Sequence, residues 1–459
     1  MRLPLRIWFW VGLEFLVLAA LACLRAKLWT YGSDTGTFAQ IVGDAFHGMR
    51  NGVEEGSHYR YHWSPALALL WPLVALTHSA LPLQILQAGA TAACAPLVAL
   101  LARPYMEERL AQRLAVLTLL YPPLLALGFD EFHELGLFTA LVLGMFVAAQ
   151  YGRWPWFAAC AAIGIGLRED AALTLFFFGI ALAAVGLRPL QPRAFVVAGA
   201  LTAAGSAGVL LLYYGVVAPR FGGWRPSHFY VYPFANGPLA LILSPLTHPL
   251  AFARSIFTFG RLTYILEALV PLAFLPLRSR WALLALPGAA VVLLANSGYV
   301  WRMGDHYAAL WIPWLLVATI AGVVVVARYS GARTARNWTT AATAICVVFL
   351  VAFDPMHPLH YLHSYYHDLA DARRAIDCVP NNAPLATYDE WFSAVAAARP
   401  HATIDRTSGV EYLVYADDFP SPAYQLRMRP AIAAEVAGGR YRAICRFGNV
   451  TAYETVPLR

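Results

Sequence analysis

Several loops between apolar segments carry carboxylates, imidazoles and guanidinium groups, the types that perform acid–base and phosphate chemistry. The first of these loops contains Asp34 and, further on, the run His62-Trp63-Ser64-Pro65. The second contains Phe129-Asp130-Glu131-Phe132-His133. Carboxylates act as general bases or bind divalent cations, histidine transfers protons, and the planar fork of arginine suits phosphate. These residue types together favour a site that handles an anionic substrate.

Three further loops extend this inventory. The third contains Arg168-Glu169-Asp170, the fourth runs from Pro219 to Arg261 and includes Arg225, and the fifth contains Arg302, Asp305 and His306. Each residue alone also fits an ordinary structural role, such as a helix cap, an interfacial side chain or a local ion pair. Because ionisable side chains at the ends of membrane spans are costly to bury, their joint placement favours a functional site.

The elements that must position these loops are membrane spans. The chain of 459 residues is 59% hydrophobic and only 13% charged, whereas a soluble domain has about a quarter charged residues. The net charge of +7 comes largely from Arg residues between apolar runs, which is an orientation signal rather than a nucleic-acid-binding patch. The composition therefore predicts an α-helical polytopic membrane protein that contacts lipid and no nucleic acid.

About eleven apolar runs are long enough to be spans at roughly 15–25 residues each. If successive spans alternate in direction, the Arg-rich segments before the first span and after every second span all lie on the same side of the membrane. The positive-inside rule makes that side cytoplasmic. We expect a multi-pass protein of the cytoplasmic (inner) membrane with a cytoplasmic N-terminus. The expected spans are 5–24, 81–102, 112–128, 134–150, 154–167, 171–187, 194–217, 262–277, 281–296, 306–327 and 339–354.

Two segments decide this topology. Residues 63–78, within the outer loop 25–80, are apolar but short and interrupted by Pro65 and Pro72, so we expect an interfacial or re-entrant helix there. Residues 154–186 would form a helix of about 50 Å, too long for a bilayer of about 30 Å. We expect this segment to break at Arg168-Glu169-Asp170 into two short spans.

The loop motifs resemble a known family. Asp34 followed by His62-Trp63-Ser64-Pro65 resembles the "D…HFSP" pattern of the bacterial and archaeal membrane proteins named domain of unknown function 2079 (DUF2079). The second loop resembles that family's "DFH", and Leu167-Arg168-Glu169-Asp170 resembles its "KED" with Arg168 at the Lys position. The segment Arg374-Ala375-Ile376-Asp377-Cys378-Val379-Pro380 resembles the entry to the family's last domain. The family is in turn similar to GT-C glycosyltransferases, whose fold has many spans and a catalytic carboxylate in the first outer loop.

The resemblance implies that Asp34 is the catalytic base or a metal-linked carboxylate, with Asp130 or Glu131 as the second-loop acid. The sequence lacks a paired D-x-D at Asp34 because position 36 is Gly36. The cofactor is therefore left open: if a divalent metal ion takes part, Asp34, Asp130 and His133 are the candidate ligands. The candidate substrate-binding residues are His62, His133, Arg168, Glu169, Asp170, Arg225, Arg302, Asp305 and His306, of which Arg168, Arg225 and Arg302 are candidates for the donor phosphate.

We expect the chain to divide into a GT-C-like transmembrane domain, 1–354, and an extracytoplasmic α/β domain, 355–459. In the latter, an amphipathic pattern predicts a helix from Leu369 to Val379, and alternation predicts strands at 384–388 and 411–415. A hairpin is predicted over 441–456 with its turn at Gly448-Asn449. Cys378 and Cys445 both fall in this domain, and the sequence leaves open whether they form a disulfide.

These features favour a GT-C-type glycosyltransferase that moves a sugar from a polyprenyl-phosphate donor to an acceptor on the outer face of the membrane. The alternatives are a transporter or flippase of an anionic lipid or solute, and a non-catalytic membrane assembly protein. A transporter is disfavoured because no internal repeat is evident and the ionisable residues lie at span ends rather than span centres. The sequence does not specify the sugar, the acceptor or the oligomeric state.

Overall fold

The computed structural model describes residues 3–185, 192–223, 238–297, 300–361, 369–419, 421 and 424–456. The chain forms two compact units. The first, here called the helical unit, comprises Met1–Ala19, Tyr59–Ala66 and Leu86–Met356. The second, here called the mixed unit, comprises Ala20–His58, Leu67–Ile85 and His357–Arg459. Most of the loop 25–80 thus belongs to the same unit as the C-terminal domain, whereas Tyr59–Ala66 belongs to the helical unit. No local sequence pattern predicts this association.

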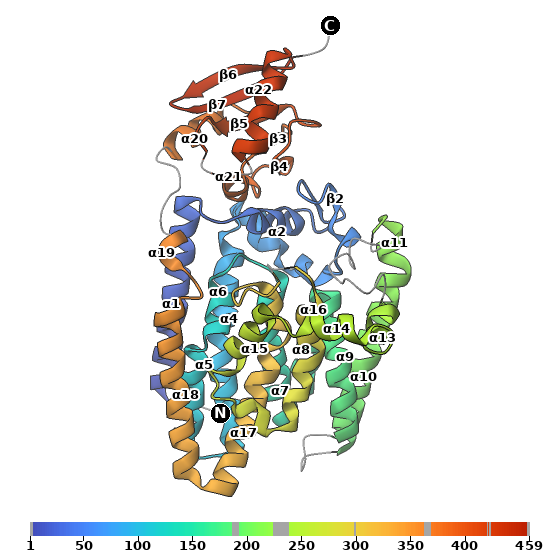
Figure 1. Cartoon of the computed structure of the whole chain (residues 1–459), viewed down its shortest axis with the longest axis vertical. Helices are drawn as coiled ribbons and strands as arrows, with labels where there is room; N and C mark the ends of the chain where they lie inside the picture. The colour runs from blue at the N-terminus through green and yellow to red at the C-terminus, as the bar shows by residue number, and fades with distance from the viewer. Residues whose placement is uncertain are drawn as a thin grey trace. The chain divides into compact units, whose positions relative to one another are not determined.

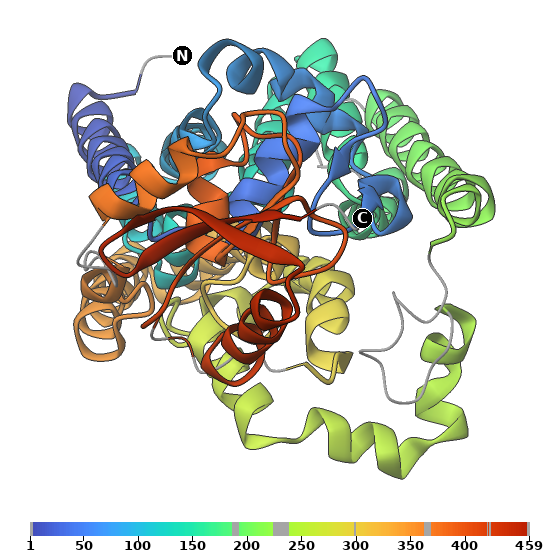
Figure 2. The ribbon, with the colours of Figure 1, turned by 90° about the horizontal axis from the view of Figure 1, so that it is seen from above.

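The helical unit is an assembly of long helices joined by short helical turns (Figure 1). Shorter helices α13 and α14 lie outside the body of this assembly (Figure 2). The helices are α1 (Leu5–Leu28), α4 (Leu81–Ala102), α5 (Glu108–Leu119), α6 (Pro122–Phe129), α7 (Phe138–Gln150), α8 (Trp154–Leu167), α9 (Glu169–Val185), α10 (Pro192–Leu212), α11 (Ala218–Arg220), α13 (Pro238–Thr247), α14 (Pro249–Ile256), α15 (Phe259–Leu269), α16 (Leu286–Leu294), α17 (Ile312–Ser330) and α18 (Ala332–Phe353), with turns η1 (His58–Arg60), η2 (Pro65–Leu70), η3 (Arg103–Tyr105), η4 (Glu134–Leu137), η5 (Tyr213–Val217), η6 (Leu275–Arg278), η7 (Arg280–Ala285) and η8 (His306–Leu310).

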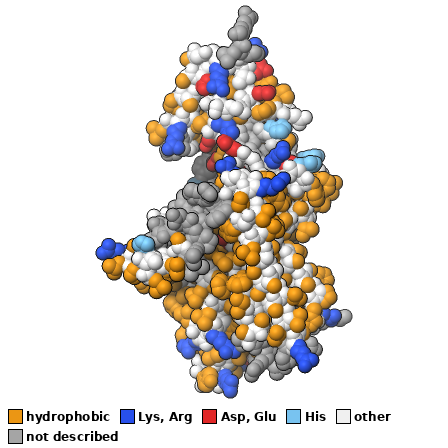
Figure 3. Space-filling view, turned by 90° about the vertical axis from the view of Figure 1, so that its right-hand side faces the viewer, with side chains coloured by type: hydrophobic (Ala, Val, Ile, Leu, Met, Phe, Trp, Pro, Cys, Tyr) orange, Lys and Arg blue, Asp and Glu red, His pale blue; other side chains and the backbone are white. Residues whose placement is uncertain are grey.

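Within the described part of the chain, five helices are long and apolar enough to cross a membrane, and the bent pair α5 and α6 makes a sixth if counted as one span. Further apolar helices are shorter, at 10–17 residues. Burial separates inner from outer helices: 61% of the apolar window around α4 and 67% of that of α17 are buried, against 17% for α1 and 22% for α18. Hydrophobic side chains accordingly cover the wall of this unit, as a lipid-facing surface requires (Figure 3). The chain is a multi-pass membrane protein; the number of about eleven crossings stays a prediction.

The predicted break at Arg168 is confirmed, because α8 ends at Leu167 and α9 begins at Glu169. Helix α9 then packs closely on α10 through Gly179 and Gly199. A Cβ atom at Gly179 would lie 2.5 Å from the backbone nitrogen of Ala203, and one at Gly199 would lie 2.4 Å from that of Ala183. Small residues of this kind allow membrane helices to approach closely.

The segment expected to be interfacial or re-entrant contains the 3₁₀ turn η2 followed by α3 (Trp71–Thr77). Helix α3 ends where His78 adopts a left-handed conformation, with φ of 49°. At about 2 Å and 1.5 Å per residue, the two elements together extend roughly 22 Å, less than a hydrocarbon core of about 30 Å. Their length therefore favours the non-crossing interpretation.

The mixed unit contains a five-stranded sheet with strand order β4-β3-β5-β7-β6, in which β3 is parallel to β4 and β5 and the other pairs are antiparallel. The predicted helix, both predicted strands and the hairpin with its turn at Gly448-Asn449 are confirmed. A small hairpin, β1 and β2, lies in the first loop. The elements are α2 (Ser33–Gly43), β1 (Arg50–Asn51), β2 (Gly56–Ser57), α3, α19 (Pro358–Tyr361), α20 (Leu369–Asp377), β3 (Leu385–Thr387), α21 (Asp389–Val395), β4 (Ala402–Ile404), β5 (Tyr412–Ala416), η9 (Tyr424–Met428), α22 (Arg429–Ala437), β6 (Tyr441–Phe447) and β7 (Val450–Thr455).

A disulfide joins Cys378, just after α20, to Cys445 in β6. The bond fastens the helix to the hairpin that the sheet places beside it. Its formation answers the question that the sequence left open.

Candidate functional site

A buried group of ionisable side chains, here called the Arg168 cluster, lies in the helical unit and comprises Glu134, Arg168, Asp170, His306 and Tyr307. The guanidinium of Arg168 donates to Tyr307 Oη at 2.9 Å and to Glu134 Oε1 at 3.4 Å, and its Nε lies 3.2 Å from Asp170 Oδ2. Its Nη1 is 3.3 Å from His306 Nε2. One arginine thus connects residues that come from three loops far apart in the sequence.

The break between α8 and α9 explains why Arg168 can reach these partners. Arg168 is extended, with φ of −165° and ψ of 152°, so its side chain leaves the helical path. Glu169 and Asp170 follow in the first turn of α9, where the helix dipole stabilises negative charge. Burial opposes the charge of Arg168, but Tyr307 and the carboxylates of Asp170, Glu134 and Glu169 raise its pKa well above its usual range. Arg168 is therefore charged at neutral pH.

Glu169 extends the cluster to the residues at the end of the first loop, His62 and Trp63. Its Oε1 lies 2.8 Å from His62 Nδ1, and its Oε2 accepts a hydrogen bond from the backbone N–H of Trp63 at 2.8 Å. A carboxylate beside Nδ1 favours the tautomer that carries its proton there, so Nε2 is the basic nitrogen of His62. The Glu169 side chain is 2% exposed and that of His62 is 24% exposed, which leaves the imidazole accessible from the surface.

The second loop is held by Gln87, a fully buried residue of α4. The Gln87 amide donates to the carbonyl oxygens of Leu127, Asp130 and Glu131 at 3.0, 3.2 and 3.1 Å. Its carbonyl oxygen accepts from the backbone N–H of His133 at 3.1 Å. One side chain therefore fixes the backbone on both sides of the Asp130-Glu131 pair.

The environment of this loop raises the pKa of one group, Asp130, and lowers the pKa of another, His306. Burial, with the neighbouring carboxylates of Glu131 and Asp305, raises the pKa of Asp130 to about 8. Burial, with the nearby charges of His133 and Arg168, holds the pKa of His306 well below its usual range. The rings of His133 and His306 stack with their centroids 3.5 Å apart, and Asp305 Oδ1 lies 3.1 Å from His306 Nδ1. Carboxyl groups with a pKa near neutrality can both donate and accept protons.

Of the other two candidate phosphate ligands, only Arg302 lies within the described residues. Arg302 lies in the turn before Asp305 with an exposed side chain, and Arg225 lies outside the described residues. Over the part of the chain that the structure describes, no group of three or more His, Cys, Asp or Glu side chains could hold a metal ion.

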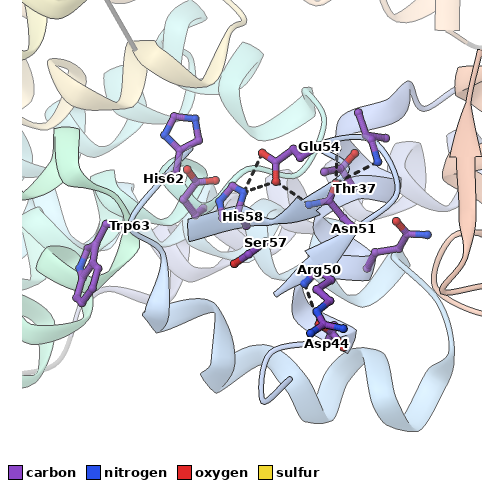
Figure 4. Close-up of polar contacts among 12 residues, drawn as sticks. Thr37, Asp44, Arg50, Asn51, Glu54, Ser57, His58, His62 and Trp63 are labelled. Carbon is purple, nitrogen blue, oxygen red and sulfur yellow. Dashed lines mark hydrogen bonds and ion pairs between the residues drawn. The ribbon is translucent and has the colours of Figure 1, made fainter. Parts of the chain in front are cut away.

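Asp34 belongs to the mixed unit, in the first turn of α2, and its side chain is exposed. The rest of its loop is ordered by short polar contacts (Figure 4). Glu54 lies 2.9 Å from Nδ1 of the buried His58 and accepts from the amide of Asn51 at 2.6 Å. The carboxylate of Asp44 accepts from the backbone N–H of Arg50 at 2.8 Å.

Helix α2 is packed against α21 of the C-terminal domain at Gly36. A Cβ atom at Gly36 would lie 2.7 Å from the Phe392 ring and 2.8 Å from the Cα of Ser393, closer than real Cβ atoms approach. Position 36, where a paired D-x-D would require a second aspartate, therefore has no room for a side chain.

Gln40 joins the same two segments. Its amide donates to the carbonyl oxygens of Arg399 and Ala402 at 3.1 and 3.0 Å, and its carbonyl oxygen accepts from the backbone N–H of Gly52 at 2.8 Å. The C-terminal domain therefore helps to position the helix that carries Asp34.

Sequence reasoning did not select Glu134, Tyr307 or Gln87. Glu134 and Tyr307 were adjacent to selected residues, His133 and His306, but nothing local marks them as partners of an arginine. Gln87 had a usable signal, because a polar amide within an apolar span must find hydrogen-bond partners.

The fold of this chain resembles that of solved membrane proteins. The solved structure of ArnT from Cupriavidus metallidurans bound to undecaprenyl phosphate resembles this chain with a TM-score of 0.54 at 12% identity, covering 98% of both chains. The structure of ArnT from the same organism in the apo state resembles this chain with a TM-score of 0.50 at 12% identity, covering 96% of this chain and 97% of that one. The protein has an ArnT-like GT-C fold over nearly its whole length.

The family follows from the sequence. The model of the predicted membrane proteins DUF2079 matches residues 26–417, and the chain belongs to this family. The archaeal oligosaccharyltransferase AglB from Archaeoglobus fulgidus, solved with an inhibitory peptide and a dolichol-phosphate, is also similar, with a TM-score of 0.47 at 14% identity over 95% of this chain and 73% of that one. No protein of curated function matches the sequence.

Proposed function

We propose that this protein is a glycosyltransferase that transfers a sugar from a polyprenyl-phosphate donor to an acceptor hydroxyl outside the cytoplasm. In this reaction the bond between the anomeric carbon and the phosphate oxygen breaks, and a bond between that carbon and the acceptor oxygen forms. The acceptor proton passes to a base, and polyprenyl phosphate is released. The observation that carries the proposal is the Arg168 cluster in a membrane protein of ArnT-like GT-C fold.

The residues divide into proton-transferring and charge-stabilising groups. Asp34 is the proposed base for the acceptor hydroxyl, as an exposed carboxylate of the first outer loop. His62, oriented by Glu169, and Asp130, with its raised pKa, are the proposed proton carriers of the helical unit. The donors of Arg168 are already directed at Glu134, Asp170, His306 and Tyr307, so its proposed contribution is the positive potential of the cluster and the placing of these groups.

An apolar groove between α8 and α10 supports a lipid-linked donor. Its volume is about 610 Å³, and its lining includes Phe157, Ala161, Ile165 and Leu201. Ile165 lies three residues before Arg168, about 4.5 Å along a helix axis. A polyprenyl chain in this groove would have its phosphate end near the Arg168 cluster.

Orientation and compartment belong to the same proposal. The Arg-rich loops favour a cytoplasmic N-terminus, and the disulfide between Cys378 and Cys445 favours an extracytoplasmic C-terminal domain, since disulfides persist in oxidising compartments. We therefore place the reaction at the outer face of the cytoplasmic membrane.

The test compares lipid-linked and envelope glycans, by mass spectrometry, in cells that lack the protein and in the same cells complemented with variants. Wild type should restore a missing glycan, Asp34→Asn should not, and both should be present in the membrane at equal amounts. Glu108→Gln is the matched control and should restore the glycan, because Glu108 is exposed and has only surface partners among the described residues, an ion pair with Arg103 and a hydrogen bond from Gln112 at 3.4 Å.

Restoration by both Asp34→Asn and wild type would contradict the role of Asp34. No glycan difference between null and complemented cells, together with solute or lipid flux in liposomes, would replace the transferase with the transporter alternative.

A further inference from the structure

A small cavity lies wholly within the mixed unit. Its volume is about 90 Å³, and its walls come from the end of α1, the start of α2, the start of α4, and α21. The polar and aromatic side chains that line it are Trp29, Tyr31, Thr35, Ser79, Gln84, Glu390 and Ser393. Thr35 directly follows Asp34, the proposed base, in the first turn of α2.

The polar wall of the cavity is held in place by packing. The amide of Gln84 donates to Thr35 Oγ1 at 2.8 Å. Gly36 allows α21 to approach α2 so closely that Ser393 Cα would lie 2.8 Å from a Cβ atom at position 36. A wall with fixed geometry binds a ligand with a smaller loss of conformational entropy than a mobile one.

The aromatic wall is fixed by cations from the same unit. The guanidinium carbon of Arg25 lies 4.1 Å from the centroid of the Tyr31 ring, and that of Arg373 lies 5.2 Å from that of Trp29. The Arg25 side chain is itself buried and also lies 4.2 Å from the centroid of Tyr361. Because a guanidinium already lies over each ring, a cationic ligand would gain little from a further cation–π contact there.

The charge of the lining also disfavours phosphate. Of the described residues that line the cavity, only Glu390 is charged, and it is negative. Hydroxyl groups donate to a carboxylate and exchange hydrogen bonds with the Gln, Thr and Ser side chains present. The apolar face of a sugar ring packs on Trp or Tyr, as in pockets that combine aromatic walls with a few placed polar groups.

The size of the cavity restricts it to a small ligand. A cavity needs about 10–15 Å³ to hold one water, so 90 Å³ accommodates roughly six to nine such volumes. A polyprenyl chain would not fit, whereas the apolar groove of the helical unit is several times larger.

We propose that this cavity binds a neutral sugar ring. This proposal rests on the proposed transferase function and names the part of the substrate that is recognised beside α2. The ring belongs either to the donor or to the acceptor, and both present the same hydroxyl-rich chemistry. Glu390 and Gln84 bind its hydroxyls, and Trp29 or Tyr31 packs on its apolar face.

The test uses the full-length protein in nanodiscs and saturation-transfer NMR with the methyl glycosides of glucose, galactose, mannose and N-acetylglucosamine. At least one glycoside should receive saturation from wild type. Ala394→Trp fills the cavity from its exposed rim and should abolish the signal, whereas Ala433→Trp, on the exposed face of α22, should leave it unchanged. Glu390→Gln should weaken binding about fivefold, because a hydrogen bond to a charged group is stronger than a neutral one by roughly 1 kcal/mol.

Absence of saturation transfer to every glycoside with wild type, or its survival in Ala394→Trp, would overturn the proposal. Competition identifies the source of the ring: a polyprenyl-phosphate sugar that displaces the glycoside assigns the cavity to the donor, and an oligosaccharide that does so assigns it to the acceptor. Glycoside binding without any glycan change in null cells would refute the transferase function and leave this inference standing. A glycan defect without glycoside binding would refute the inference alone.

Discussion

Glu169 provides the most informative perturbation of the helical unit, because its carboxylate makes two hydrogen bonds of 2.8 Å with the His62 ring and the Trp63 backbone. A hydrogen bond to a charged group contributes about 1.5–3 kcal/mol. Glu169→Ala removes both bonds and leaves two donors without their acceptor, so it should lower the free energy of unfolding by about 3–6 kcal/mol. The lower end is expected, since the His62 side chain is 24% exposed and solvent weakens its bond.

Glu169→Gln keeps one carbonyl acceptor and turns an N–H₂ group toward the other donor. It should therefore lower the free energy of unfolding by about 1.5–3 kcal/mol. The assay is unfolding of the detergent-solubilised protein by denaturant, followed by intrinsic fluorescence, with Glu108→Gln as the matched control. Glu108 is half exposed and its ion pair with Arg103 is 3.8 Å long, so the control should change stability by less than about 0.5 kcal/mol. If Glu169→Gln is as stable as the control, Glu169 does not hold the end of the first loop and the reasoning is wrong.

Three further predictions concern other parts of the chain. Gly36→Ala should destabilise the protein by about 1–3 kcal/mol through overpacking against Phe392. Gly43→Ala in the same helix is the control and should be neutral or stabilising, because its Cβ would meet only Val74 at 3.8 Å. Equal stabilities of the two variants in chemical denaturation would contradict the close packing at Gly36. The pKa of Asp130 is raised to about 8 in the folded protein, from about 4 when unfolded, so the folded state binds more protons between these pH values and its stability falls as pH rises from about 4 to 8. Asp130→Asn should remove this pH dependence, together with a carboxyl infrared band that titrates near pH 8. An unchanged band in the variant would refute the assignment. Loss of the disulfide through Cys378→Ser should cost about 4 kcal/mol, as expected for a loop of 67 residues, and identical migration of wild type with and without reductant, after cleavage within that loop, would show that the bond does not form.

Local patterns were sufficient for several elements of this fold. Alternating hydrophobicity and the Gly448-Asn449 turn predicted the hairpin of β6 and β7, and both form as expected. The excessive length of the apolar run 154–186 predicted the break at Arg168, which the structure contains. These features depend on residues close in sequence, where periodicity, helix length and turn chemistry act.

The contacts that build the candidate site depend on residues far apart in sequence. Gly36 meets Phe392, and Gln87 holds the loop at Asp130, yet neither pair has a spacing that a local pattern can reveal. The absence of a second aspartate at position 36 was visible in the sequence, but its cause, the close approach of α21, required the structure. Strand β4 and helix α21 are three and seven residues long, too short for a periodic signal.

The polar residues chosen for their chemistry differ in how the structure uses them. Arg168 has four side-chain partners and is an organising group of its cluster. Asp34, in contrast, has an exposed side chain in the first turn of α2. Residue type alone did not distinguish these two environments, because burial is set by the tertiary fold.

The most direct test of the central claim is whether the purified protein, reconstituted in liposomes, releases polyprenyl phosphate from a polyprenyl-phosphate sugar in the presence of an envelope extract. Mass spectrometry of the lipid fraction quantifies the product. The account predicts release with wild type, equal release with Glu108→Gln, and a loss of at least a hundredfold with Asp34→Asn, as removal of a general base implies. Donors that stay intact with wild type across a panel of sugars, or equal release with Asp34→Asn, would contradict it.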